Sequence, residues 1–94
     1  KVDHEVEAAA EVLRSGQEEV DLTALLHQLA RRGHHVVLVE GGPSLNADLH
    51  AADLVHAWCV TIAPSAIGGE ASRMNGPGTA TARPLRPARV VALG

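Results

Sequence analysis

The chain has 94 residues, a single aromatic residue (Trp58) and a formal net charge of −3. This length allows at most one small domain, and the acidic balance argues against a nucleic-acid partner. The one cysteine, Cys59, excludes an internal disulfide, and its apolar neighbours predict a buried, unreactive thiol in a cytoplasmic protein. No apolar run is long enough to cross a membrane, so no membrane partner is expected.

The first part of the chain predicts one firm helix. Residues 1–9 are acidic and alanine-rich, which fits either a fraying helical turn or a disordered lead-in, and residues 10–14 fit a helix or a strand. Asp21 is a good N-cap and Gly33 is placed to end a helix as its C′ residue. Between them, four leucines follow the spacing of one helical face: Leu22, Leu25, Leu26 and Leu29.

The centre of the chain predicts a strand, a glycine turn and a second helix. Residues 36–39 are all apolar, which is typical of a strand buried on both faces. Glu40 follows them and is expected to be half-buried at the end of the strand, where α/β sheets bind ligands. Gly41 and Gly42 allow a tight turn, and a helix over residues 43–51 begins with a proline at its first position.

This turn has the chemistry of an anion site. The start of a helix offers unpaired N–H groups and a positive dipole end, which suit a phosphate and most simply that of a nucleotide. The donors would come from the turn and the first helical residues, which are Gly41, Gly42, Ser44 and Leu45. The alternative is a turn that needs glycine for geometry alone. Glu40 could accept hydrogen bonds from a substrate hydroxyl or amide, or it could tie down the turn itself.

The last third of the chain predicts two more strands separated by a long loop. Residues 55–63 are apolar on both faces and are expected to lie inside the protein or against a partner. Residues 65–87 are rich in Gly and Pro and predict a loop, and residues 89–93 read as a last strand. With residues 10–14 taken as a strand, the order of elements predicts an α/β layered fold with a mostly parallel sheet.

Common catalytic and metal-binding patterns are not found in the sequence. The six histidines lack metal-ligand spacing, so no metal site is predicted. There is no G-x-S-x-G motif and no carboxylate pair placed for glycoside hydrolysis. No catalytic residue is therefore assigned.

Several short motifs occur together and in a fixed order: Val20-Asp21-Leu22, residues 38–46 (LVEGGPSLN), Asp53-Leu54-Val55, Ile62-Ala63-Pro64 and Ile67-Gly68-Gly69. From about Ala10 to its end, the chain resembles the C-terminal half of the riboflavin-biosynthesis reductase domain, a pyrimidine reductase family with a dihydrofolate-reductase-like fold. The resemblance implies that residues 10–94 are only the C-terminal part of a longer reductase domain. It also implies a strand at residues 10–14 and a homodimer joined through C-terminal strands.

The resemblance also implies an activity and a site. Members of the family use NADPH to reduce a phosphoribosylamino-pyrimidine by hydride transfer. The cofactor phosphates would lie at Gly41, Gly42, Pro43, Ser44 and Leu45, and Glu40 would face the ribose end of the substrate. The chain departs from the family at His56-Ala57, where Asp-Glu is common.

Three interpretations remain open at this point. The first is an NADPH-dependent reductase of the riboflavin pathway. The second is a non-catalytic, dimerising α/β half-domain with a vestigial nucleotide-phosphate site. The third is a phosphate-binding fragment of some other α/β enzyme. No residue pattern distinguishes NADPH from NADH or specifies which pyrimidine is the substrate.

Overall fold

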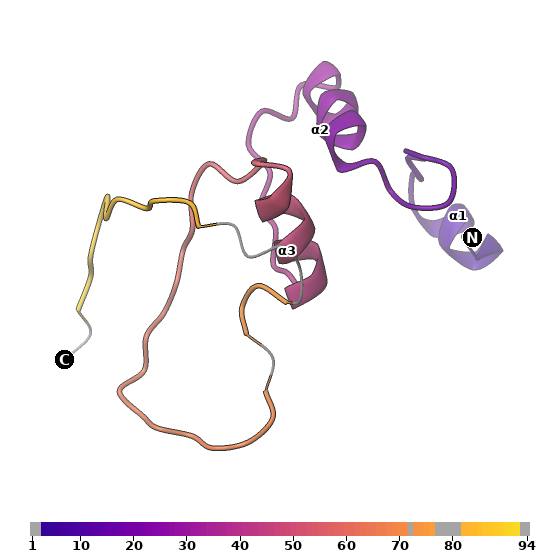
Figure 1. The fold of residues 1–94 in the computed structure, drawn as a ribbon. Coiled ribbons are helices and arrows are strands. Elements are labelled where there is room, and N and C mark those ends of the chain that lie inside the picture. The colour runs from indigo at the N-terminus through magenta and orange to yellow at the C-terminus, as the bar shows by residue number, and fades with distance from the viewer. Residues whose placement is uncertain (1–2, 72, 77–81, 93–94) are drawn as a thin grey trace.

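The structure, a computed structural model, describes residues 3–71, 73–76 and 82–92. Within these residues the elements are three helices in the order α1 (His4–Ala9), α2 (Leu22–Arg31) and α3 (Pro43–Ala51). Figure 1 shows α3 between the helical N-terminal part and a long excursion of the chain that follows it.

Helix α1 is short and is held by local contacts. The carboxylate of Asp3 caps it by accepting a hydrogen bond from the N–H of Glu5 at 3.1 Å. The guanidinium group of Arg14 pairs with Glu7 on this helix. Of the two expectations for residues 1–9, the helical one is therefore confirmed for residues 4–9.

Helix α2 forms where the leucine spacing predicts it. Asp21 caps the helix, because its Oδ1 accepts a hydrogen bond from the N–H of Ala24 at 2.9 Å. Gly33 follows the helix with a φ of 90°, and the N–H of His34 then bonds back to the oxygen of Leu29 at 3.0 Å. This left-handed glycine ends the helix as expected, since such a φ is costly for residues that carry a Cβ.

Helix α3 holds the most buried side chain of the described structure. Leu49, on this helix, is 6% exposed and is the one buried hydrophobic residue among those described. The helix ends where Asp53 adopts a φ of 56° and the N–H of Leu54 bonds to the oxygen of Leu49 at 3.0 Å. The helix predicted over residues 43–51 is confirmed.

The predicted sheet is wrong for this chain. The described residues contain no β-strand, so the expected α/β layered, mostly parallel architecture is not formed. The segments at residues 10–14, 35–39, 55–63 and 89–92 are irregular chain without strand pairing, and residue 93 lies outside the described ranges. A helix satisfies its own backbone, whereas a strand needs a second segment beside it, and these segments have none within the described chain.

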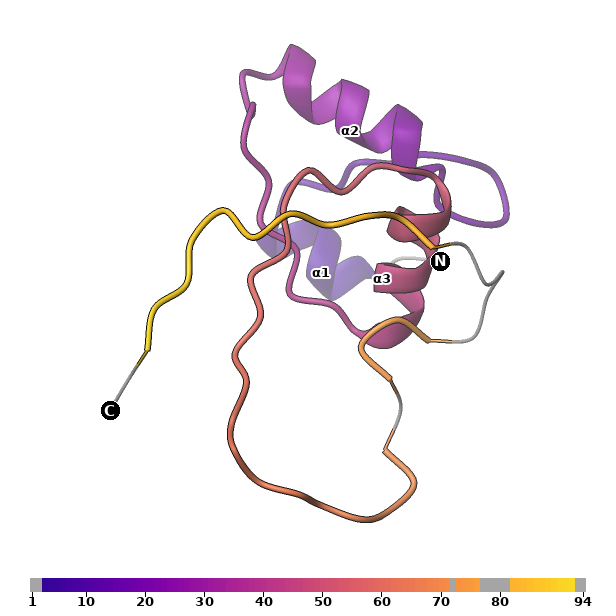
Figure 2. The ribbon, with the colours of Figure 1, turned by 60° about the vertical axis from the view of Figure 1, so that its left-hand side comes forward.

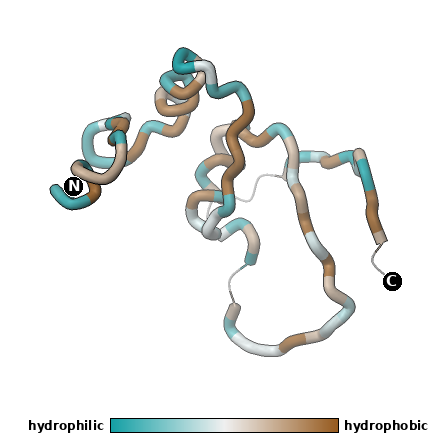
Figure 3. The backbone as a smooth tube through the Cα atoms, turned by 180° about the vertical axis from the view of Figure 1, so that it is seen from behind, coloured by the Kyte–Doolittle hydropathy of each residue, from teal (hydrophilic) through white to brown (hydrophobic). Residues whose placement is uncertain are grey.

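Burial differs from expectation for the same reason. Val36, Leu38 and Ile62 are 93%, 80% and 88% exposed, so the expectation that residues 36–39 are buried on both faces is wrong. Cys59 is exposed as well, and the prediction of a buried thiol is also wrong. Figure 3 shows hydrophobic stretches along the extended parts of the chain, outside the helices.

The chain is correspondingly open. Its radius of gyration is 16.5 Å, against about 12 Å expected for a compact domain of this length. In Figure 2 the chain leaves the end of α3, runs out in a wide excursion and comes back toward the same helix. In the part of the chain that the structure describes, no helix is both long and apolar enough to cross a membrane.

Candidate functional site

The glycine turn lies immediately before α3. Gly41 has a φ of 85°, a conformation that favours glycine, and Gly42 is the N-cap residue of the helix. The peptide bond between them is cis. A Cβ added to Gly42 would meet nothing within 4 Å, so the turn is open on that side.

The start of α3 leaves backbone donors unpaired. The first backbone bond of the helix runs from the N–H of Asn46 to the oxygen of Gly42 at 3.0 Å. Gly42 has no side chain to cap the N–H groups that precede this bond, and those of Ser44 and Leu45 find no acceptor among the described residues. Ser44 is exposed and Leu45 is half-buried. The structure thus brings these predicted donors together at the positive end of a helix.

Glu40 lies next to this turn but is more accessible than expected. Its side chain is exposed, so the prediction that it is half-buried is wrong. If Glu40 tied down the turn, its carboxylate would accept a hydrogen bond from the turn, and no such bond occurs within the described chain. The carboxylate is therefore open to solvent beside the glycines.

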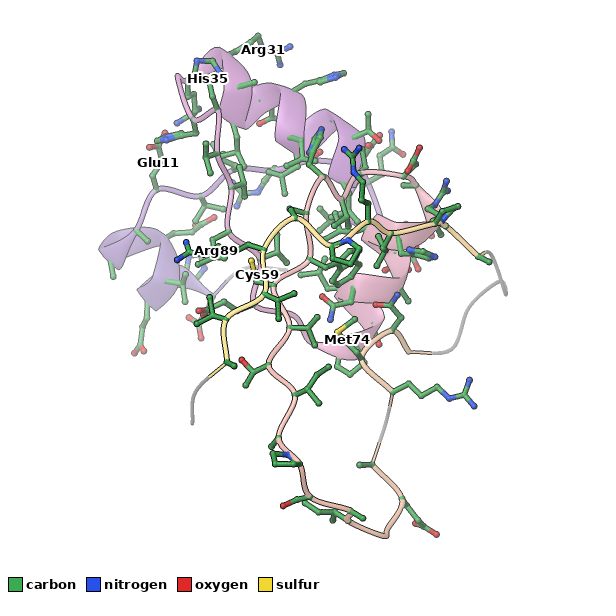
Figure 4. The ribbon with its side chains drawn as sticks, turned by 90° about the vertical axis from the view of Figure 1, so that its left-hand side faces the viewer. Glu11, Arg31, His35, Cys59, Met74 and Arg89 are labelled. Carbon is green, nitrogen blue, oxygen red and sulfur yellow. The ribbon has the colours of Figure 1, made fainter. Side chains whose placement is uncertain are left out.

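A second segment lies against the turn, and sequence reasoning did not predict this contact. The side-chain Nδ2 of Asn46 donates to the backbone oxygen of Met74 at 2.9 Å. The N–H of Gly76 donates to the backbone oxygen of Pro43 at 3.0 Å. Figure 4 shows the labelled Met74 next to α3. Residues 73–76 therefore border the start of the helix, although about thirty residues of chain separate them from it.

One polar atom in this segment has no partner. Oδ1 of Asn75 is buried and accepts no hydrogen bond in the described structure. Gly76 is the one sequence signal for the contact of residues 73–76 with α3, since a glycine is common where two stretches of backbone approach closely. The acceptor for Asn46 is a backbone carbonyl, however, and a carbonyl leaves no trace in the sequence.

Metal-binding chemistry is not brought together in the described residues. They contain no group of three or more His, Cys, Asp or Glu side chains that could hold a metal ion. The chemistry available at the turn is instead that of backbone N–H donors, one serine hydroxyl and one exposed carboxylate. Such a set can bind an anion and, beside it, a group that donates hydrogen bonds.

Comparison with known proteins assigns the family. The model of the RibD C-terminal domain family matches residues 1–94. The chain belongs to this family. Two archaeal proteins are similar to this chain.

The archaeal relatives carry the name 2,5-diamino-6-ribosylamino-4(3H)-pyrimidinone 5′-phosphate reductase. The protein from Archaeoglobus fulgidus is 41% identical over 68 residues, which are 72% of this chain and 31% of the relative. The one from Methanothermobacter thermautotrophicus is 38% identical over 69 residues, 73% of this chain and 32% of the relative. The chain thus spans about a third of the length of these relatives.

A bacterial relative is the riboflavin biosynthesis protein RibD of Chlamydia muridarum, which is 39% identical over 64 residues. The match covers 68% of this chain and 17% of that protein. No solved structure gives a significant match to the chain.

Proposed function

We propose that this chain supplies the cofactor-phosphate part of an NADPH-dependent reductase of the riboflavin pathway, which acts on a ribosylamino-pyrimidine 5′-phosphate. Family membership and the names of the archaeal and chlamydial relatives support the pathway and the reductase class. Because the chain spans only part of those relatives, the substrate and the complete activity are part of the proposal.

The observation that carries the proposal is the set of unpaired donors at the start of α3. The N–H groups of Ser44 and Leu45 have no acceptor among the described residues, and the space beside Gly42 is open. A phosphate oxygen would accept hydrogen bonds from these groups and gain from the positive end of the helix dipole. Pro43 fits here because it has no N–H to leave unpaired. Gly41 supplies the left-handed conformation that turns the chain into the helix.

Glu40 is proposed to bind the substrate. Its exposed carboxylate lies one residue before the turn and can accept hydrogen bonds from ribose hydroxyls. When bound, NADPH supplies the hydride for the reduction. The part of this chain is to hold the phosphates and the ribose end so that donor and acceptor carbons meet in a suitable orientation.

A second candidate function is that of a non-catalytic module which dimerises through its extended segments. The observation in its favour is the exposure of apolar side chains such as Val60 and Ile62, which are 57% and 88% exposed. A second copy of the chain would cover them by strand pairing. A homodimer also belongs to the reductase proposal, so dimerisation alone does not separate the two functions, whereas NADPH binding does.

The deciding experiment is a calorimetric titration of the chain with NADPH, NADH and inorganic phosphate, using the variants Gly42→Asp and Gly68→Ala. Gly68 lies outside the turn and a Cβ added there meets nothing within 4 Å, so Gly68→Ala should leave binding intact. Gly42→Asp places a carboxylate at the N-cap, where it would occupy the free N–H groups and repel a phosphate. Circular dichroism of both variants controls for the helices.

The expected result is saturable NADPH binding that Gly68→Ala keeps and Gly42→Asp reduces at least tenfold, while helicity stays the same or rises. Equal NADPH affinity of the two variants would contradict a phosphate site at this turn. A preference for NADPH over NADH would support the choice of cofactor. Binding of inorganic phosphate with no gain for NADPH would favour a generic phosphate site, the third interpretation of the sequence.

A further inference from the structure

Residues 73–76 and the first turn of α3 are joined by two hydrogen bonds that lie close together. One runs from the N–H of Gly76 to the oxygen of Pro43 at 3.0 Å, and the other from Nδ2 of Asn46 to the oxygen of Met74 at 2.9 Å. Both bonds involve backbone atoms of the segment, so they fix the position of its chain and not only of a side chain.

The two stretches of chain approach closely at Gly76, which leaves little room for a side chain. A Cβ built on Gly76 would lie 3.2 Å from the oxygen of Pro43 and 3.3 Å from its carbonyl carbon. These neighbours are backbone atoms of a helix and cannot turn away as a flexible side chain would. The φ of Gly76 is not in the left-handed region, so close packing is the reason that glycine suits this position.

Asn46 touches both sides of this contact. Its backbone N–H donates to the oxygen of Gly42 in the glycine turn at 3.0 Å. Its side-chain Nδ2 lies beside Gly41, since a Cβ built there would come within 3.4 Å of it, and donates to the oxygen of Met74 in the segment. One half-buried residue therefore links the turn that precedes α3 to a part of the chain that returns to it from far along the sequence.

We propose that Asn46 is a positioning residue that holds residues 73–76 beside the glycine turn, so that this segment forms one wall of the cofactor site. The ligand in this proposal rests on the proposed function, whereas the link between Asn46 and the segment does not. Residues 73–76 lie against Pro43, next to the residues with free N–H groups. They should therefore limit the directions in which the rest of a cofactor can extend from a phosphate bound at the turn. Their loss should weaken the binding of a dinucleotide and not that of inorganic phosphate.

Two substitutions break the link, and a third serves as a control. Asn46→Leu keeps the approximate shape of the side chain and removes the donor to Met74. Gly76→Ala forces a Cβ against Pro43. Gly68→Ala makes the same chemical change in the excursion of the chain, where a Cβ meets nothing within 4 Å.

Two measurements on the 94-residue chain separate the link from the ligand. Amide hydrogen exchange at Gly76 reports the link itself, with the amides of α3 around Leu49 as the internal standard. Calorimetry gives the affinities for NADPH and for inorganic phosphate.

We expect Asn46→Leu and Gly76→Ala each to speed exchange of the backbone amide of residue 76 by roughly tenfold, about the effect of losing one hydrogen bond, with α3 unchanged. NADPH should bind several-fold more weakly and inorganic phosphate equally well. Gly68→Ala should change none of these values.

Unchanged exchange at Gly76 in Asn46→Leu would overturn the link. Two results would overturn the role of the segment as a wall of the site. One is faster exchange with an unaltered affinity for NADPH, and the other is an equal loss of affinity for NADPH and for inorganic phosphate. If the unmodified chain bound no NADPH, the proposed function and the wall would both fall, while exchange at Gly76 would still decide whether Asn46 holds the segment.

Discussion

The guanidinium group of Arg83 lies at the C-terminal end of α3, where its Nε donates to the backbone oxygen of His50 at 2.9 Å. A second nitrogen of the same group donates to the oxygen of Ala51 at 3.2 Å, and a third lies 3.3 Å from Oδ1 of Asp53. The last carbonyls of a helix form the negative end of its dipole, which favours a cation, and the oxygen of His50 also accepts from the N–H of Asp53 at 3.1 Å. Arg83 therefore caps a helix that ended some thirty residues earlier.

Arg83→Ala should destabilise α3. Loss of the two charge-assisted bonds to the helix end should lower the free energy of unfolding by about 1–2 kcal/mol, with little more from the exposed pair with Asp53. Urea titration followed by circular dichroism measures this change. Arg86→Ala is the matched control, since Arg86 is exposed and makes no contact of this kind in the described structure. Equal effects of the two substitutions would contradict the capping role.

Leu49 and Leu38 should respond very differently to the same substitution. Leu49 is 6% exposed and Leu38 is 80% exposed, so Leu49→Ala removes buried contacts whereas Leu38→Ala removes almost none. We expect Leu49→Ala to cost about 2–3 kcal/mol and Leu38→Ala less than about 0.5 kcal/mol. Thermal unfolding followed by circular dichroism compares them. A comparable loss in Leu38→Ala would mean that residues 36–39 pack against something in solution.

Alanine substitutions at Gly16 and Gly33 distinguish the cost of steric overlap from the cost of a strained backbone. Both have a left-handed conformation, with φ of 84° and 90°. A Cβ on Gly33 would meet nothing within 4 Å, whereas a Cβ on Gly16 would overlap the backbone oxygen of Glu19. Gly33→Ala should therefore cost only the conformational penalty of about 1–2 kcal/mol. Gly16→Ala should cost clearly more in chemical denaturation, and an equal cost would show that the turn at residues 16–19 adjusts freely.

The cap of α2 is a side-chain acceptor, a role that does not require a charge. Oδ1 of Asp21 accepts from the N–H of Ala24 at 2.9 Å, and an asparagine can accept in the same way. Asp21→Ala should lower the stability of α2 by about 1 kcal/mol, and Asp21→Asn should lower it by much less. Amide exchange at Ala24 and Leu25 measures both. An asparagine variant as weak as the alanine variant would assign the effect to the helix dipole instead.

Helices α2 and α3 were predictable because their signals are local. Asp21, Gly33 and the leucine spacing between them identify α2, and Pro43 identifies the start of α3. The hydrogen bonds of a helix lie within the segment itself, so a short stretch of sequence contains the whole reason for it. The same holds for the glycine turn, where the positions of the donors follow from the start of α3.

The strands failed because their signal is incomplete. Residues 36–39 and 55–63 have the apolar character of buried strands, but composition cannot supply the neighbouring chain that pairs with them. In the described structure no segment takes that place, and the side chains of Val36 and Ile62 remain exposed. The contact between Asn46 and Met74 was missed for a related reason, since it joins distant parts of the chain through a backbone atom.

Two hydrogen-bonded contacts hold the returning chain against α3, and they affect how the chain tolerates insertions. Gly76 donates to the oxygen of Pro43 at the start of the helix, and Arg83 donates to the oxygen of His50 near its end. The returning chain is therefore bound near both ends of this nine-residue helix. Residues 64–70 lie after α3 and before Gly76, and they are exposed. Extra residues inserted there should leave both contacts with the helix formed, because each doubling of the length of a loop costs only about 0.6 kcal/mol. A fluorescent reporter or affinity tag can therefore be inserted in this stretch without disturbing the helix that both contacts share.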